Sequence, residues 1–413
     1  MNRLLSISMI LLAMAADCSG GDGGIRRMDR GSGSGDIKPG TGTAAGERIL
    51  PGSERMEHYL PLLQGKRVAL VVNHTSVVGG SHLVDTLLSR GIELGEIMKV
   101  FVPEHGLRGN FDAGQEFDDG RDARTGLPVI SLYGKHKKPL PDDLKGIDLV
   151  VFDIQDVGAR FYTYITTLHY VMEACAENGV PLLVLDRPNP NGGYVDGPVL
   201  EPGFRSFVGM HPIPVVYGLT MGELAGMING EGWLEEGIRC DLGVIPCHGY
   251  SHGDPYSMPV SPSPNLASDH AIRLYPSTCF FEGTVISEGR GTEMPFEVYG
   301  HPDLQGNFSF TPVSMPGRST HPKHQDRLCR GEDLRGFEPE GGWNRLHLEF
   351  LLDAYARYPR KEEFFTGYFE TLAGTPDLRL QIEAGWSAAQ IRKSWQPGIG
   401  EFMKKREKYL IYE

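Results

Sequence analysis

Polar residues follow several apolar runs of the chain, at the point where each run ends. Candidate catalytic or binding side chains stand at four of these ends: Asn73 and His74; Glu104 and His105; Asp153, Gln155 and Arg160; and Asp186. In an open α/β sheet, ligands bind beyond the carboxyl ends of the parallel strands. One polar strand end is commonly a helix cap, but four of them at one edge favour a ligand site.

Carboxylate chemistry is the chemistry that these residue types support best. Glu104 directly follows an apolar run, and Glu282 and Glu288 lie on a glycine-rich stretch farther along the chain. Two carboxyl groups across a cleft can cleave a glycosidic bond, because one protonates the leaving oxygen while the other activates water or attacks the sugar. Arg290 beside them would suit a sugar that carries a carboxylate. Each of these residues could equally be a loop residue in an ordinary salt bridge.

Nucleotide and metal chemistry find little support. The turn after the first apolar run, residues 73–80, does not match GxGxxG, and GxxxxGK[ST] does not occur. Several histidines could approach carboxylates in the fold but lack the HExxH spacing of a zinc site: His74, His105, His136 and His169. We therefore expect no cofactor, no catalytic metal and no serine nucleophile.

The elements that would position these residues alternate between strands and helices. Six apolar runs are predicted as strands: residues 67–72, 99–102, 129–132, 148–152, 181–185 and 242–245. Several runs are continuous rather than alternating, which is typical of parallel strands buried on both faces. Between them, Ile165, Leu168, Met172 and Cys175 form one stripe of a helix that ends at Asn178-Gly179. A second helix is predicted over residues 220–234. The pattern predicts a Rossmann-like, mostly parallel α/β sheet.

Length and charge limit the architecture and the partners. The chain has 413 residues, enough for two domains, and a formal net charge of −13, which argues against a duplex nucleic-acid binder. Strands become sparse past about residue 270, and helices are predicted over 344–358 and around Phe402. We therefore predict a Rossmann-like domain over residues 48–270 and a smaller α+β subdomain over 271–413.

The N-terminal residues indicate export. One arginine precedes an apolar run from Leu4 to Ala16, which is typical of a signal peptide and too short for a permanent membrane span. Cys18 follows at once, which predicts a signal and lipobox over residues 1–18 and a Gly/Ser-rich tether over 19–47. Asp17 departs from the small residue usual before a lipidated cysteine, so plain secretion is the alternative. The remaining cysteines are odd in number and are expected to be buried free thiols.

Six longer motifs are specific enough to indicate a family. They are VPEHGLRG at 102–109, DIQDVGARFYTY at 153–164, LDRPNP at 185–190, SPNL at 263–266, FEGT at 281–284 and GRGT at 289–292. They resemble a bacterial family long catalogued as a domain of unknown function and now associated with exo-acting β-N-acetylmuramidases. The likeness extends from about residue 55 to the C-terminal YLIY. Residues 301–335 are more polar and richer in histidine than the resemblance leads us to expect.

The resemblance implies a site in the cleft between the two domains and removal of N-acetylmuramic acid from the non-reducing end of peptidoglycan chains, in cell-wall turnover. It implies Glu104 and His105 as catalytic residues, and we pair them with Glu282. The residues expected to bind substrate are Asn73, His74, Asp153, Gln155, Arg160, Asp186, Glu288 and Arg290. The lactyl carboxylate of muramic acid would pair with Arg290 or Arg160.

Other interpretations stay open at this stage. A non-catalytic lipoprotein that binds muropeptides would keep the same cleft, and an amidase or esterase would need a metal or a serine nucleophile. Either anomeric outcome is compatible with these residues, and so is attack by the substrate's own acetamido group. The expected partners are peptidoglycan fragments; no nucleic acid is expected, and a membrane only through a lipid on Cys18. The oligomeric state is open.

Overall fold

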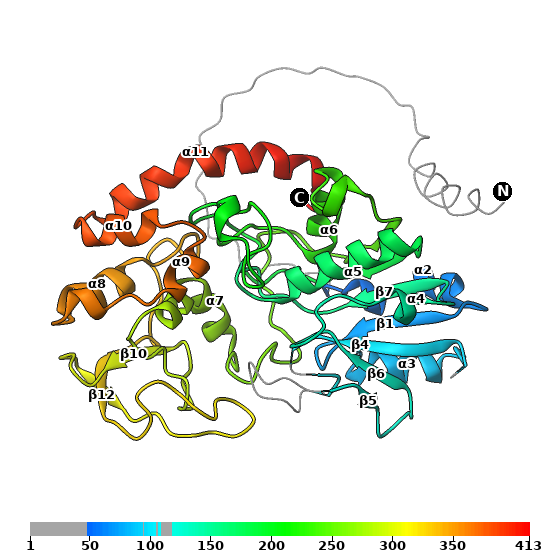
Figure 1. The fold of residues 1–413 in the computed structure, drawn as a ribbon, viewed down its shortest axis with the longest axis horizontal. Coiled ribbons are helices and arrows are strands. Elements are labelled where there is room, and N and C mark those ends of the chain that lie inside the picture. The colour runs from blue at the N-terminus through cyan, green and yellow to red at the C-terminus, as the bar shows by residue number, and fades with distance from the viewer. Residues whose placement is uncertain (1–47, 94, 105, 109–117) are drawn as a thin grey trace, which may run out of the picture. The chain divides into compact units, whose positions relative to one another are not determined.

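Seven strands form one sheet in the first half of the described chain (Figure 1). The computed structural model describes residues 48–93, 95–104, 106–108 and 118–413. The strand order is β5-β6-β4-β1-β7-β8-β9, and all neighbours are parallel except β5, which is antiparallel to β6. The bounds are β1 Val68–Val72, β4 Ile97–Val102, β5 Gly120–Arg121, β6 Pro128–Ser131, β7 Leu149–Asp153, β8 Leu182–Leu185 and β9 Leu242–Ile245.

The six parallel strands confirm the predicted Rossmann-like sheet. Numbered along the chain, they stand in the order 3-2-1-4-5-6, which is that of the doubly wound dinucleotide-binding fold. Each predicted strand coincides with an observed one to within two residues at either end. The short β2 (Val77–Val78) and β3 (Ser81–His82) form a separate hairpin between β1 and the next helix.

Helices cover both faces of the sheet. They are α2 Met56–Leu63, α3 Leu83–Ser89, α4 Pro141–Leu144, α5 Tyr164–Asn178 and α6 Met221–Gly230. On β1, Val68 and Leu70 belong to the core under α2 and α3, whereas Ala69 and Val71 belong to the core under α5 and α6. Successive side chains of a strand point to opposite faces, so a strand between two cores is apolar at every position.

Glycines set the ends of the two long helices of this region. Gly179 follows α5 with a left-handed φ of 62°, as the Asn178-Gly179 pair predicts. Helix α6 starts at a capping box between Thr220 and Glu223. It ends at Gly230 rather than at the predicted Leu234, because Gly232 turns the chain out of the helix with a φ of 67°.

The chain after residue 268 has the predicted α+β architecture. Three antiparallel strands form a sheet in the order β10-β12-β11. The bounds are α7 Asp269–Thr278, η4 Cys279–Gly283, β10 Val298–His301, β11 Phe308–Phe310, β12 Cys329–Asp333, α8 Glu349–Arg357, α9 Tyr368–Ala373, α10 Asp377–Glu383 and α11 Ala388–Arg406. Helices α8 and α11 lie where the apolar stripes predict them.

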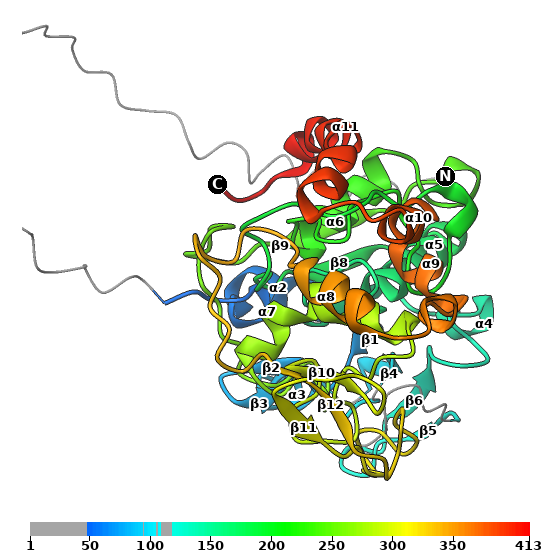
Figure 2. The ribbon, with the colours of Figure 1, turned by 90° about the vertical axis from the view of Figure 1, so that its left-hand side faces the viewer.

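The last long helix ties the two parts of the fold together. Helix α11 lies beside α6 in both views of the ribbon (Figures 1 and 2). Trp395 and Phe402 of α11 belong to the same apolar core as α5 and α6. The core on that face of the sheet therefore continues without a break into the C-terminal region.

The predicted free thiols are confirmed for five cysteines: Cys175, Cys240, Cys247, Cys279 and Cys329 are buried and unpaired. No helix among the described residues combines the length and apolar character that a membrane span requires. The predicted signal, Cys18 and the tether lie outside the described residues, and so does His105.

Candidate active site

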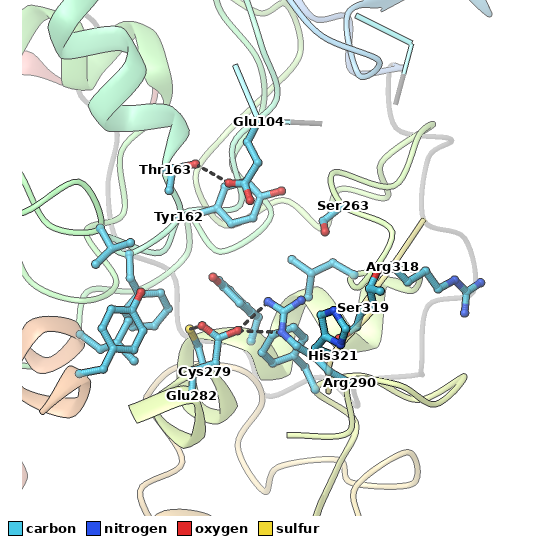
Figure 3. A pocket seen from close by; sticks show the side chains of 18 of the residues that line it. Glu104, Tyr162, Thr163, Ser263, Cys279, Glu282, Arg290, Arg318, Ser319 and His321 are labelled. Carbon is cyan, nitrogen blue, oxygen red and sulfur yellow. Dashed lines mark hydrogen bonds and ion pairs between the residues drawn. The ribbon is translucent and has the colours of Figure 1, made fainter. Parts of the chain in front are cut away.

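A cavity of about 800 Å³ opens beyond the carboxyl end of β4 (Figure 3). One part of its wall comes from the sheet side: Glu104, Tyr133, Phe161, Tyr162, Thr163 and Val208. The other part comes from the C-terminal region: Ser263, Leu266, Tyr275, Cys279, Glu282, Arg290, Phe296, Pro316, Arg318–His321, Tyr368 and Leu372. Figure 3 shows Glu104 on one side of the cavity and Glu282 with Arg290 on the other. The structure thus brings together three residues that the sequence predicts for the site.

Glu104 is positioned by the end of β4 and the start of α5. It follows Pro103 at the end of the strand and is half-buried. The Thr163 hydroxyl, one residue before α5, donates a hydrogen bond to Glu104 Oε2 at 3.2 Å (Figure 3). This hydroxyl orients the carboxyl group toward the cavity.

Glu282 is held by a cation, Arg290. Arg290 donates from Nε at 3.0 Å and from Nη2 at 2.6 Å, both to Glu282 Oε1. The guanidinium also lies over the Phe296 ring, 5.0 Å from its centroid. Burial alone would lower the pKa of Arg290, but Glu282 and Glu288 together raise it above its ordinary value. Two charge-assisted hydrogen bonds on one oxygen hold the Glu282 carboxyl group in place.

Glu288 lies next to Arg290 on the side away from the cavity and is absent from the cavity wall. Its side chain is buried, and Lys323 Nζ bonds its Oε2 at 3.0 Å. Arg290 Nε lies 3.5 Å from its other oxygen. Burial would raise the pKa of the Glu288 carboxyl, but Lys323 and Arg290 hold it below its ordinary value. The structure therefore gives Glu288 a place beneath Arg290, whereas the sequence predicts it to touch substrate.

The other predicted binding residues at the strand ends lie away from the cavity wall. After β1, Asn73 is buried and its Oδ1 accepts from the Thr75 amide and hydroxyl. One ring nitrogen of His74 lies 3.0 Å from the Ser261 carbonyl oxygen. These side chains shape the loop after β1 and tie it to the loop around residue 261.

Asp153 and Gln155 after β7 belong to the same buried network. Arg187 holds Asp153 through two bonds, from Nε at 2.6 Å and from Nη2 at 2.9 Å, and both side chains are almost fully buried. Gln155 Nε2 donates to the carbonyls of Asp156 and Pro188. This ion pair and these amide bonds join the loop after β7 to the loop after β8.

Asp186 after β8 anchors the C-terminus. Its carboxylate accepts from the Thr220 and Tyr412 hydroxyls, each at 2.6 Å, and from the Gly222 amide at 2.7 Å. Burial raises the pKa of Asp186 to about 6, against the lowering effect of these hydrogen bonds. The motif residues around Asp186 and the C-terminal tyrosine therefore meet for a structural reason.

Arg160 is likewise committed to the scaffold. Its guanidinium is fully buried and donates to the carbonyls of Pro198, Ile213, Leu372 and Ala373. Burial lowers the pKa of Arg160 to about 9. It joins three segments that are far apart in the sequence, and it is absent from the cavity wall.

Several residues of the cavity wall carry no sequence signal that we used. Tyr162 and Thr163 lie within the motif at residues 153–164, where only their aromatic and hydroxyl groups could have indicated a place in the site. The segment from Pro316 to His321 supplies a large part of the wall. It comes from the polar, histidine-rich stretch that departs from the family resemblance.

A serine motif lies near the C-terminus in the structure, outside the cavity wall. Gly249-Tyr-Ser-His-Gly253 matches the GxSxG pattern of a nucleophile elbow. The Ser251 hydroxyl donates to the Glu413 carbonyl at 2.8 Å and is absent from the cavity wall. His252 bonds Glu223 at 3.0 Å. These contacts fasten the C-terminus and do not assemble a nucleophile in the cavity.

Among the described residues, one acidic group has the spacing of a metal site: Glu173, Glu177 and Glu235. Lys138 Nζ already bonds Glu173 at 2.7 Å and Glu177 at 2.6 Å. The Lys138 ammonium group therefore offsets part of the negative charge of these carboxylates. Of the histidines considered above, His169 contacts Glu173 at 3.5 Å, and His136 is exposed.

Comparisons with known proteins agree along almost the whole described chain. Two family profiles match: "Exo-beta-N-acetylmuramidase NamZ, N-terminal" over residues 68–270, and its C-terminal counterpart over residues 273–412. The peptidoglycan β-N-acetylmuramidase NamZ of Bacillus subtilis (strain 168) is 41% identical over 376 residues, covering 86% of this chain and 89% of the relative.

Two crystal structures of DUF1343 family proteins from Bacteroides fragilis NCTC 9343 are also similar. One is 44% identical with a TM-score of 0.82, and the match covers 89% of this chain and 99% of that one. The other is 30% identical with a TM-score of 0.78 and the same coverage. Both likenesses extend over the sheet and the C-terminal region together.

Proposed function

The chain belongs to the family of the exo-β-N-acetylmuramidase NamZ, and we infer from this membership that it is a glycosidase acting on peptidoglycan-derived sugars. It releases terminal N-acetylmuramic acid from the non-reducing end of those chains. The observation in the structure that carries this function is the cavity with a carboxyl group on either side, Glu104 and Glu282 (Figure 3). Glycosidic bond cleavage needs such a pair.

We propose that Glu104 is the general acid. Its proton passes to the glycosidic oxygen while the bond from that oxygen to the anomeric carbon breaks. Support comes from its place: Glu104 follows β4, is half-buried on the cavity wall and is oriented by the Thr163 hydroxyl. Arg290 places two N–H groups on one oxygen of Glu282, so that carboxyl group is already engaged by a cation.

Glu282 takes the complementary part. A carboxylate on this side of the cavity stabilises the positive charge that develops on the sugar ring as the leaving group departs. Water then supplies the hydroxyl of the released sugar, and its remaining proton is taken up by a carboxylate of the site. Arg290 is a positioning residue in this account, because it fixes Glu282 and rests on Glu288.

The test is hydrolysis of a chromogenic β-N-acetylmuramide and of a muramic-acid-terminated disaccharide, each with and without a chelator. Release of muramic acid that is indifferent to the chelator supports the proposal. Binding without turnover would instead indicate a muropeptide-binding protein. Metal-dependent cleavage of a peptide or ester bond would indicate the other class of hydrolase.

We also propose that the protein is exported to the periplasm and anchored to a membrane through a lipid on Cys18. The support is in the sequence alone: an apolar run from Leu4 to Ala16, then Cys18 and a Gly/Ser-rich segment. The proposed substrate lies outside the inner membrane, which agrees with export. Wild-type protein should fractionate with membranes and Cys18→Ser should not; a wild-type protein in the soluble fraction contradicts the anchor.

A further inference from the structure

We propose that Arg318, at the tip of a hairpin on the cavity wall, binds the carboxylate of the substrate's lactyl group. This assignment rests on the proposed function, since a muramic acid carries this carboxylate at a position where a glucosamine carries a hydroxyl. It differs from the sequence expectation of Arg290 or Arg160, and it gives a role to the polar stretch that the family resemblance leaves unexplained.

The arginines near the cavity differ in how firmly their charge is paired. Among the described residues of the wall, the arginines are Arg290 and Arg318. Arg290 is matched by Glu282 and has Glu288 behind it, so its charge is already offset. Arg160 is buried on four carbonyls. A substrate carboxylate needs a cation whose present partner can be exchanged.

Arg318 meets that requirement. Its Nη1 bonds Glu293 Oε2 at 2.5 Å, and the Glu293 side chain is 73% exposed. An exposed ion pair contributes little net free energy, because water screens it and both side chains lose freedom in it. Releasing Glu293, so that the Arg318 side chain turns toward the cavity mouth and pairs with a substrate carboxylate there, therefore costs little, and the new pair is better shielded from water.

The hairpin that carries Arg318 is held in place by hydrogen bonds. Met315 and Ser319 exchange backbone hydrogen bonds at 2.9 and 2.8 Å around Gly317, whose φ is 84°. The buried Asn265 donates to the Arg318 carbonyl at 2.8 Å. The Val313 amide donates to the Gly291 carbonyl at 2.8 Å. Two family motifs, SPNL and GRGT, therefore fix the place of this hairpin.

Figure 3 places Arg318 at the rim rather than at the reaction centre. Its side chain extends away from Glu104 and Glu282, on the side of the cavity where Ser263 and Ser319 lie. A group in that place recognises a substituent of the sugar and does not take part in bond breaking. Its loss should therefore change KM more than kcat.

The experiment is a cycle between the arginine and the carboxylate. Two chromogenic β-N-acetylmuramides, the free acid and its lactyl methyl ester, are hydrolysed by wild type, Arg318→Gln, Arg318→Lys and Glu293→Gln. Arg335→Gln is the matched control, because Arg335 also pairs with a nearby carboxylate and is absent from the cavity wall.

We expect Arg318→Gln to raise KM for the acid about 10- to 100-fold, the range for a hydrogen bond between charged groups, and to leave the ester unchanged. Arg318→Lys should recover part of the loss. Glu293→Gln should lower KM for the acid by about two- to fivefold, the size of an exposed ion pair. The control should match wild type on both substrates.

Two results would overturn the assignment: equal losses on the acid and the ester, or no loss on the acid. A wild-type protein that turns over neither muramide would contradict the proposed function itself, so the two failures are distinguishable. Thermal melting of each variant checks that the fold is kept, which the exposed place of the hairpin tip leads us to expect.

Discussion

The ends of β1, β7 and β8 and the end of β4 look alike in sequence and differ in the structure. Asp153 and Asp186 are fully buried, and their oxygens are taken by Arg187 and by the hydroxyls of Thr220 and Tyr412. Glu104 at the end of β4 is half-buried and lines a cavity. The first region is a polar core that locks loops together, and the second is open to a ligand.

The difference shows what a polar strand end needs in order to be a site. In the Rossmann order, the crevice where ligands commonly bind lies at the carboxyl ends of the strands where the order reverses, here β1 and β7. This chain fills those ends with the Asp153–Arg187 pair and its neighbours. The cavity lies instead over β4 and β6, where the C-terminal region supplies the facing wall.

The largest expected effect is a loss of activity on substitution of Glu104, at the open strand end. Glu104→Gln keeps the shape of the side chain and removes its proton, so kcat on a natural disaccharide should fall by about 10²- to 10⁴-fold, the range for general acid–base catalysis. Thermal stability should stay near that of wild type. Glu349→Gln, an exposed carboxyl group on α8, is the control and should change neither quantity. Near-normal turnover by Glu104→Gln would move the acid role to another carboxyl group.

The opposite pattern is expected for the buried pair. Arg187→Met leaves the Asp153 carboxylate buried without its partner, which should lower the free energy of unfolding by about 3–5 kcal/mol. Urea unfolding measures the loss. The double variant Arg187→Met/Asp153→Leu should regain part of it, because no unpaired charge then remains. Full stability of the single variant would show that Asp153 does not depend on this pair.

The buried network should also make stability depend on pH. Burial raises the pKa of Asp156 from 3.8 to about 7, against hydrogen bonds from Tyr217 and Gly158. The folded state then holds a proton that the unfolded state has lost, so this group's stabilising contribution is complete below pH 4 and is lost as pH rises toward 7.

Asp156→Asn should remove that dependence. The difference in unfolding free energy between wild type and variant should change by about 1.4 kcal/mol per pH unit between pH 4 and 7. The wild type should become less stable relative to the variant as pH rises. Urea titrations at several pH values measure it. A difference that stays constant over this range would mean that Asp156 titrates alike in both states.

The smallest effect concerns the support of Glu104. Thr163→Val removes the hydroxyl that bonds Glu104 Oε2 and keeps the branched shape. Loss of one neutral hydrogen bond costs about 1 kcal/mol, so kcat/KM should fall by roughly fivefold. Thr311→Val, on an exposed position outside the cavity wall, is the matched control. An unchanged kcat/KM would show that Thr163 does not orient the acid.

The fold could be predicted because its signals are local. A continuous apolar run such as residues 148–152 indicates a strand that is buried on both faces. The apolar stripe from Ile165 to Cys175 indicates a helix that is buried on one face. Three of the predicted site residues are also confirmed at one cavity: Glu104, Glu282 and Arg290. The contribution of His105 stays a prediction, since that residue lies outside the described part of the chain.

The remainder depends on contacts that are distant in sequence. No sequence feature near Asp153 indicates that it pairs with Arg187, which follows the neighbouring strand. Likewise, nothing near Arg160 indicates that its guanidinium is surrounded by four carbonyls from three segments. The hairpin around Arg318 has no periodicity, because it is held by Asn265 and Gly291 rather than by a helix or sheet of its own. Such partners become visible only in the folded chain.

The most direct test of the central claim, that Glu104 gives its proton to the leaving oxygen, is the dependence of rate on the leaving group. Muramides with a poor and a very good leaving group are compared in wild type, Glu104→Gln and Glu282→Gln. Because a good leaving group needs little protonation, Glu104→Gln should lose much less on the activated substrate, whereas Glu282→Gln should lose similarly on both. Equal losses for Glu104→Gln on the two substrates would contradict the account.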